Sequence, residues 1–187
     1  TESVSRLAAS SEAAASEAVS TEEAASADAA AVTTVNAGKL TMSTNAAFPP
    51  YEMTTDYGDF EGIDIEVAGA IAKKLGLELQ DDDMDFAAAL LAAQNGKRDI
   101  VMAGVTVTDE RQKVMDFSDT YAEGIQSIIV PEDSDIASAD DLTGKAIGTQ
   151  RGTTGYIYCT DDFGEDNVIA YDGGLTAVQA LTNGRVD

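Results

Sequence analysis

The sequence contains no histidine among its 187 residues. Histidine is the usual general base near neutral pH, the base of the Ser-His-Asp triad and the commonest metal ligand, so the usual forms of these sites are excluded. Cysteine occurs once, at Cys159, and a single cysteine cannot form an internal disulfide. The neighbouring Tyr156, Ile157 and Tyr158 favour a small buried apolar side chain over a reactive thiol at this position.

Basic residues are also scarce. The chain has 11 Lys and Arg against 34 Asp and Glu, which gives a formal net charge of −23. Nucleic acid is excluded as a partner because phosphate binding needs a basic surface. An anionic membrane surface is repelled too, so attachment to a membrane must be covalent or through another protein. No segment approaches the roughly 18 apolar residues of a membrane span, and no signal peptide begins at Thr1.

We expect three parts in the chain. Residues 1–36 consist mostly of Ala, Ser, Glu and Thr, without an aromatic residue or an apolar stripe, which predicts a disordered linker. From residue 37 onward, short apolar runs alternate with amphipathic segments, which predicts an α/β fold with parallel strands and a ligand at their carboxyl ends. We place a first α/β lobe at residues 37–125 and a second at 126–187. Residues 185–187 read as the start of another strand, so we expect a fragment whose second lobe and return strands are incomplete.

The individual elements follow from periodicity and from glycine positions. The expected strands are residues 40–44, 77–79, 100–104, 145–149 and 168–171. The expected helices are residues 62–75, 86–94, 108–115, 156–159 and 175–181, and residues 124–130 are expected to leave the first lobe as extended chain. In the first helix Ile63, Val67, Ile71 and Leu75 share one face, and Gly76 is its expected stop.

One stretch, residues 103–118, has the arrangement of an anion site. An apolar run ends in Ala103 and Gly104 and continues through Thr106 and Thr108 into a helix that carries Arg111. Free N–H groups and the positive end of a helix dipole favour an anion at such a position, and Thr108 is the expected N-cap. The planar guanidinium of Arg111 can bind a carboxylate through two parallel hydrogen bonds. The alternative is a surface arginine paired with one of the acids beside it, at positions 109 and 110.

Eight short segments stand in a fixed order along the chain. They are FPPYE at 48–52, GDFEGIDIE at 58–66, DF at 85–86, GKRD at 96–99, AGVTVTDER at 103–111, DFS at 116–118, DLTGK at 141–145 and GTT at 152–154. With these segments in register, residues 38–187 resemble the family 3 extracellular solute-binding proteins, the polar amino-acid receptors of bacterial ABC transporters. The resemblance implies the type II fold of periplasmic binding proteins, in which two α/β lobes joined by a hinge close on a small ligand.

The resemblance also implies a set of ligand-binding residues. Arg111 would bind the ligand α-carboxylate, helped by the Gly104 N–H and the Thr106 hydroxyl, with Ala103 beside them. The rings of Phe48 and Phe86 would enclose the ligand. Asn45 would offer a polar side chain at the end of the first strand, and Thr153 and Thr154 would offer two hydroxyls at a helix N-terminus. Taken singly, the two phenylalanines could be core residues, Asn45 a turn former and Thr154 a helix cap.

The ligand ammonium has no clear partner. Family members commonly bind it with an acid near the start of the helix that follows the second-lobe strand, or with a later acid, which here would lie beyond Asp187. The region reads Tyr171-Asp172-Gly173-Gly174-Leu175, with only Asp172 displaced from the usual position. Glu52 is a fallback candidate for binding a cationic side chain.

Two acidic stretches are expected to be solvated loops. Residues 81–85 lack the Gly at the sixth position and the Glu at the twelfth that a calcium loop needs, because Phe86 and Ala92 stand there. Residues 161–166 fail in the same way. We expect no metal site, no cofactor and no catalytic residue.

The resemblance therefore implies a monomeric extracytoplasmic receptor that captures an amino acid or a similar small zwitterion by hinge closure and delivers it to the permease of an ABC importer. The linker resembles the tether of lipid-anchored receptors, so the membrane would be reached only through an upstream lipid anchor. Two alternatives stay open, the ligand-binding sensor domain of a membrane signalling protein and a dehydratase or lyase on the same fold. An enzyme needs a proton-transferring group, and the sequence offers no convincing acid/base pair.

Overall fold

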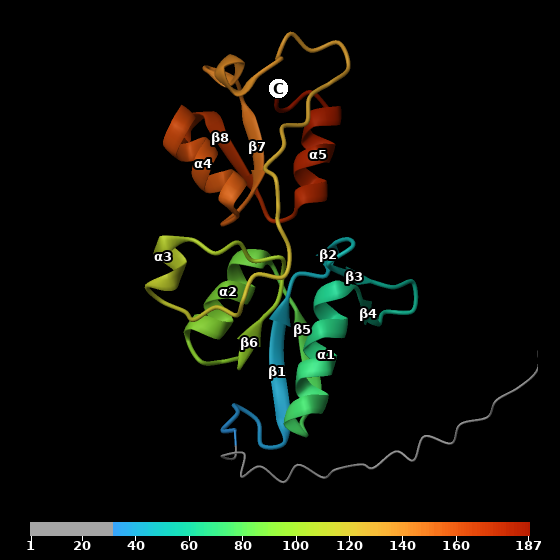
Figure 1. Cartoon of the computed structure of the whole chain (residues 1–187). Coiled ribbons are helices and arrows are strands. Elements are labelled where there is room, and N and C mark those ends of the chain that lie inside the picture. Colours follow the sequence, from blue (N-terminus) through green and yellow to red (C-terminus); the bar gives the residue numbers. More distant parts are fainter. Residues whose placement is uncertain (1–31) are drawn as a thin grey trace, which may run out of the picture. The chain divides into compact units, whose positions relative to one another are not determined.

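The first sheet lies at the centre of the amino-terminal part of the fold. In the computed structural model, which describes residues 32–187, parallel strands run in the order β5 (Glu78–Asp83), β1 (Lys39–Thr44) and β6 (Ile100–Val101) (Figure 1). The central strand β1 is buried on both faces. On one face Met42 packs with Ala68 and Met102, and on the other the Ser43 hydroxyl donates to the Ala89 carbonyl at 2.8 Å. The predicted parallel α/β arrangement is confirmed for this sheet. Residues 1–31 of the expected linker lie outside the described residues.

Helix α1 (Ile63–Leu75) begins and ends at the expected glycines. Gly62 precedes it at φ 126°, where an added Cβ would collide with the Tyr51 carbonyl, and Gly76 ends it at φ 70° in the left-handed region. The predicted apolar face is not the buried one, because Ile63, Ile71 and Leu75 are exposed. The helix instead buries small residues and one acid, which are Asp64, Ala68 and Ala72. Small side chains let the helix backbone approach the sheet closely.

Strand β5 is longer than the sequence predicts. The acids at 81–83 were expected in a solvated loop, and this expectation is wrong, because they pair in parallel register with residues 42–44 of β1. The strand lies at one end of the sheet order, so its side chains reach solvent, where charge is tolerated. Two of the acids are also engaged, Asp82 by the Arg98 guanidinium at 2.8 Å and Asp83 by the Ala46 N–H at 2.8 Å.

The segment after β1 forms a small antiparallel sheet that the sequence reading described only as turns. Its strands are β2 (Ala47–Phe48), β3 (Glu52–Thr54) and β4 (Phe60–Glu61), in the order β2-β3-β4. Helix α2 (Phe86–Gln94) then matches its prediction and buries Phe86, Ala89 and Leu90. Phe86 and Leu90 form a second core cluster with Ala103.

Helix α3 (Asp109–Gln112) is much shorter than the expected 108–115. Thr108 caps it as predicted, since its Oγ1 accepts a hydrogen bond from the Arg111 N–H at 3.2 Å. A helix of one turn has few aligned peptide groups, so the expected contribution of a helix dipole to the anion site is small.

The carboxyl-terminal elements form a second α/β group. Parallel strands β7 (Ile147–Gln150) and β8 (Val168–Tyr171) pair with each other, and α4 (Thr154–Phe163) and α5 (Gly174–Thr182) pack against them (Figure 1). Two 3-10 helices, η1 (Ala139–Leu142) and η2 (Glu165–Asn167), complete this group. The second acidic stretch is therefore also not a simple loop, since residues 161–163 end α4 and 165–166 begin η2. Residues 119–138, called here the crossing segment, join the two sheets without a helix or strand.

The last residues are held against the start of β7. The Asp187 N–H donates to the Ala146 carbonyl at 2.8 Å, and the Ala146 N–H donates to the Asp187 carboxylate at 2.8 Å. Residues 185–187 are not assigned as a strand, but these two bonds place them beside β7, which agrees with their strand-like sequence.

Candidate functional site

Arg111 is buried, with 7% of its surface exposed. Its Nη1 donates to the Thr106 carbonyl at 2.8 Å, and its Nη2 donates to the Gly152 carbonyl at 3.0 Å. The guanidinium carbon lies 5.6 Å from the centre of the Phe86 ring, within cation–π range. We call Arg111 and these three neighbours the Arg111 site. The alternative of a surface arginine paired with Asp109 or Glu110 is wrong, because Arg111 is buried and forms no salt bridge with either acid, and Glu110 pairs with Lys113 at 3.4 Å.

The Arg111 guanidinium remains a cation. Burial lowers its pKa from the ordinary arginine value, and the nearby Tyr158 acts in the opposite direction. Arginine is nevertheless not deprotonated in proteins, so the site carries a fixed positive charge. The two bonds to carbonyls use only part of its donor set. The remaining N–H groups have no acceptor among residues 32–187, which leaves them available for an anion.

The two predicted aromatic residues differ in their burial. Phe86 is buried at the start of α2, and its ring lies beneath Arg111. Phe48 is 50% exposed and stacks on Tyr51 at 5.4 Å between ring centres. Its ring also faces Gly104, where an added Cβ would lie 3.0 Å from the Phe48 Cε1. Phe48 therefore offers an open apolar face next to the Gly104 turn, whereas Phe86 supports the guanidinium from below.

The expected role of the Gly104 N–H is wrong. This N–H already donates to the Oδ2 of Asp64 at 2.9 Å, so it is engaged by the protein. The Ala103 side chain is buried in the cluster of Phe86 and Leu90. Thr106 contributes through its carbonyl, which accepts from Arg111. The Thr106 residue is exposed, so its hydroxyl can still reach a ligand.

Asn45 follows strand β1, Thr153 and Thr154 stand at the start of α4, and all three take part in hydrogen bonds. Asn45 donates to the Met84 carbonyl at 3.0 Å and accepts from the Gln150 side chain at 2.9 Å. Thr153 is the N-cap of α4, since its Oγ1 accepts from the Tyr156 N–H at 3.3 Å. The Thr154 hydroxyl donates to the Gln126 side chain at 3.4 Å. The sheet ends of the two α/β groups are thus joined by the bonds Arg111–Gly152 and Asn45–Gln150.

The family assignment follows from comparison with known proteins. The sequence profile of the bacterial extracellular solute-binding proteins, family 3, matches residues 40–187. The chain belongs to this family. It is 34% identical over 161 residues to a probable histidine-binding protein of Neisseria gonorrhoeae, a match that covers 84% of this chain and 60% of that protein. The chain therefore spans less than two thirds of that relative's length.

Solved structures agree with this family-3 assignment. An ancestral arginine-binding protein bound to arginine has 42% identity and a TM-score of 0.74, covering 80% of this chain and 68% of that one. An ancestral amino acid-binding protein described as a precursor of cyclohexadienyl dehydratase has 34% identity and a TM-score of 0.72, again over 80% of this chain and 68% of the other. The predicted two-lobed, type II α/β fold is thereby confirmed.

Sequence reasoning missed several residues around the site of this family member. Gln150 is the last residue of strand β7, and the rule that ligands lie at the carboxyl ends of parallel strands could have pointed to it. Gln126, in the crossing segment, contacts the start of α4 and carries no local signal in the sequence. The Asp64 carboxylate beneath Gly104 was read only as part of a family segment.

Glu52 does not fit its fallback role. Only 1% of its surface is exposed, so it cannot touch a ligand side chain. Burial, followed by the charge of Asp64, raises the pKa of the Glu52 carboxyl to about 9, and Glu52 is therefore neutral at physiological pH. Asp172, the displaced acid, is exposed and pairs with Arg151 at 3.6 Å. Neither acid supplies a clear partner for a ligand ammonium.

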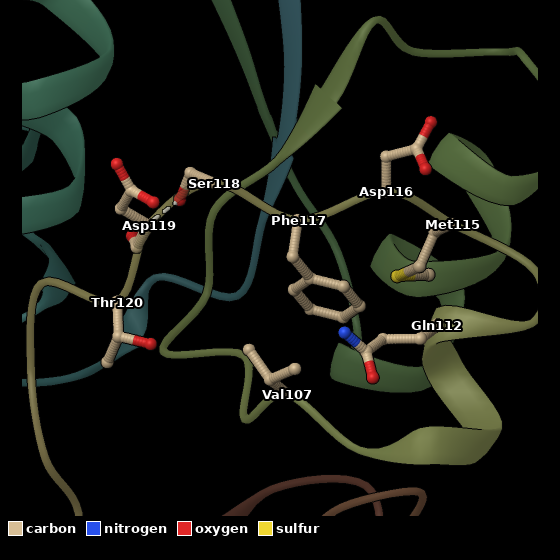
Figure 2. A pocket seen from close by; sticks show the side chains of 8 residues that line it. All are labelled: Val107, Gln112, Met115, Asp116, Phe117, Ser118, Asp119 and Thr120. Carbon is tan, nitrogen blue, oxygen red and sulfur yellow. Dashed lines mark hydrogen bonds between the residues drawn. The ribbon is translucent and has the colours of Figure 1, made fainter.

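A cavity of about 440 Å³ lies beside α3. Figure 2 shows the Phe117 ring inside it, between Val107 and Gln112. It is lined by Val107, Gln112, Met115, Asp116, Phe117, Ser118, Asp119 and Thr120. None of the nine predicted ligand-binding residues lines it, so it is a separate hollow. Within residues 32–187 no group of acids and cysteine could hold a metal ion, and no helix there is long and apolar enough to cross a membrane.

Proposed function

We propose that this chain is the ligand-binding part of a solute receptor that captures an amino acid or a similar small zwitterion. The observation that carries the proposal is the buried guanidinium of Arg111, held against Phe86 and between two carbonyls, with N–H donors left for an anion. Burying a cation without a nearby carboxylate costs free energy unless a bound anion neutralises its charge. The ligand α-carboxylate is that anion.

Capture by closure is supported by the two bonds that join the sheet ends. Arg111 reaches the Gly152 loop, and Asn45 reaches Gln150. A ligand that contacts both α/β groups only when these ends meet shifts the population toward the closed form. Thr106, Phe48 and Thr154 remain candidates for the ligand surface, because each is at least partly exposed. The Thr106 carbonyl holds Arg111, the Phe48 ring faces Gly104, and Thr154 begins α4 two residues after Gly152.

The binding energy is within reach of so small a ligand. Micromolar affinity corresponds to about 8 kcal/mol. Hydrogen bonds to charged groups contribute roughly 1.5–3 kcal/mol each, so a carboxylate bound by two N–H groups and an apolar contact with Phe48 supply most of it. The remainder must come from the ammonium and the side chain of the ligand.

Cationic amino acids are the first ligands to test. The relatives described above carry histidine-binding and arginine-binding names. The net charge of −23 also raises the local concentration of a cation and its association rate. This electrostatic contribution is screened by salt, so the association rate should fall as ionic strength rises.

We further propose that the receptor works on the outer side of the cytoplasmic membrane and delivers its ligand to an ABC importer, held there by an upstream lipid anchor. The family description as extracellular supports the location. A sensor domain of a signalling protein would use the same site with a different output. Retention of the protein in the membrane fraction, with release after removal of the lipid, tests the anchor, and recovery in the cytoplasm contradicts it.

An enzyme on this fold is the second candidate, since one similar structure is described as a dehydratase precursor. The acid pair that could transfer protons is Glu52 with Asp64, but both side chains are buried away from any substrate, at 1% and 0% exposure. Release of a new product from a bound amino acid or cyclohexadienyl acid, followed by NMR, would favour the enzyme.

The deciding experiment is calorimetric titration of the purified protein with each common amino acid. We expect arginine, lysine or histidine to bind most tightly, and Arg111→Ala to abolish the heat signal. The matched control is Lys113→Ala, which removes an exposed cation from the end of the same helix. Equal loss of binding in both variants, or unchanged binding in Arg111→Ala, would contradict the proposal.

A further inference from the structure

Three ionisable side chains gather around Asp64 on α1. They are Asp64 itself, Tyr121 in the crossing segment and Glu52 on β3, where the Asp64 N–H donates to the carbonyl of the preceding Tyr51 at 2.9 Å. The Tyr121 hydroxyl donates to the Asp64 Oδ1 at 2.8 Å, and the Gly104 N–H donates to the Asp64 Oδ2 at 2.9 Å. Each carboxylate oxygen of Asp64 therefore has one donor, which is the arrangement of an ionised acceptor.

Glu52 is in the opposite situation. Both of its carboxyl oxygens are buried, and neither accepts a hydrogen bond from a residue in the described part of the chain. An ionised carboxylate in this position would be unpaired and next to a second negative charge, which is strongly unfavourable. Burial and then the charge of Asp64 raise the pKa of the Glu52 carboxyl to about 9, and when Glu52 carries a proton, its O–H can donate to Asp64, which adds to this shift.

Tyr121 completes the cluster as a donor. Tyr121 is 49% exposed, and its partial burial, followed by its hydrogen bond to Asp64, raises the pKa of the phenol well above its ordinary value, so it keeps its proton. The ionisable groups that face the pair are Asp64 from α1, Tyr121 from the crossing segment and Tyr51, which precedes Glu52. These groups carry a single negative charge, on Asp64.

The cluster is connected to the Arg111 site through the backbone. Asp64 fixes Gly104, which has φ 56° and lies against the Phe48 ring. Gly104 leads in two residues to Thr106, whose carbonyl holds Arg111. Through Tyr121, the same carboxylate also fixes the start of the chain that joins the two sheets.

We propose that Glu52 and Asp64 share one proton and that this pair, with Tyr121, positions the Gly104 turn and the crossing segment for ligand binding. The proposal rests on the receptor function proposed above and adds positioning residues to it. None of the three touches the ligand. Their effect is to hold the backbone that carries Arg111 and the backbone that moves when the two groups close.

The shared proton is tested by unfolding in urea at a series of pH values, with Glu52→Gln as the neutral isosteric variant. The wild-type protein must take up a proton at Glu52 when it folds, whereas the variant need not. The ratio of the folding constants, variant over wild type, should therefore rise between about pH 5 and about pH 9, by up to about tenfold per pH unit. The control is Glu61→Gln, an exposed carboxyl on the neighbouring strand β4. A ratio for Glu52→Gln that changes by less than about twofold over this range overturns the shared proton.

The positioning role is tested by ligand affinity in folded variants. Tyr121→Phe removes one donor to Asp64 and should weaken binding by about tenfold, since hydrogen bonds to charged groups are the stronger kind. Tyr57→Phe, at an exposed tyrosine, is its control. Glu52→Gln should bind within about threefold of wild type, because its amide can still donate to Asp64, whereas Glu52→Ala should not.

The outcomes separate this proposal from the receptor function. If the wild-type protein binds no amino acid, the receptor function fails, and the unfolding series still decides whether the proton is shared. If the wild type binds but Tyr121→Phe and Glu52→Ala bind equally well, the receptor function stands and the positioning role is overturned.

Discussion

Replacement of Arg111 by lysine removes the planar guanidinium and keeps the charge. The arginine donates to two carbonyls that lie on different segments, Thr106 at 2.8 Å and Gly152 at 3.0 Å, while its flat face rests on Phe86. A lysine ammonium is a single point and cannot span both carbonyls and also present two parallel N–H groups to a carboxylate. We therefore expect folding to persist and ligand binding to weaken.

The magnitude follows from the bonds that are lost. At least one charge-assisted hydrogen bond disappears from the complex, at roughly 1.5–3 kcal/mol, and part of the stacking on Phe86 is lost, at roughly 0.5–1 kcal/mol or more because the site is buried. The sum is about 2 kcal/mol or more, and about 1.4 kcal/mol corresponds to a tenfold change in affinity. The dissociation constant should rise by about 30-fold or more.

Isothermal titration calorimetry of the wild type and of Arg111→Lys, with the amino acid that binds most tightly, measures this ratio of dissociation constants. Urea unfolding of both proteins without ligand measures how much stability is lost with the bonds that Arg111 makes inside the protein. Lys113→Arg, the reverse exchange at an exposed position on the same turn, should leave the affinity unchanged. Affinity within about threefold of wild type in Arg111→Lys would show that the paired N–H groups do not hold the ligand.

Three further changes test the structure around this site. Glu52→Gln should gain stability relative to wild type as pH rises from about 5 to about 9, by at most about 1.4 kcal/mol per pH unit. The reason is that the raised pKa of Glu52 in the folded state makes the wild type lose stability in this pH range. Urea midpoints of the two proteins that change in parallel with pH would contradict this. Gly104→Ala should lower the folding stability by about 1–2 kcal/mol, because a residue with a Cβ is strained at φ 56° and the Phe48 ring must move aside. An unchanged melting temperature would argue against this strain. Thr108→Ala should cost about 1 kcal/mol through loss of the cap on Arg111, and equal stability of Thr108→Ser and Thr108→Ala would refute the cap.

Residue order was sufficient to predict several local features of the fold. Gly76 ends α1 because a left-handed residue must follow the last turn, and Thr108 caps α3 because its hydroxyl can reach an N–H three residues ahead. Alternating short strands and helices also predicted parallel pairing, which the structure shows in the sheet β5-β1-β6 and in the pair β7-β8, whereas the small sheet β2-β3-β4 is antiparallel. These features depend on neighbours along the chain, so residue order is sufficient to predict them.

The partners of the side chains depend on how the elements pack in three dimensions. Asn45 and Gln150 are bonded although 105 positions separate them, and the N–H of Gly104, expected to be free, is taken by Asp64 40 positions earlier. The acids at 81–83 entered a strand because an edge position lets them reach solvent, and Glu52 became neutral because β3 buries it beside another acid. The burial and the electrostatic environment of a side chain depend on how the elements pack against one another. They involve residues far apart in the sequence, so local residue order does not predict them.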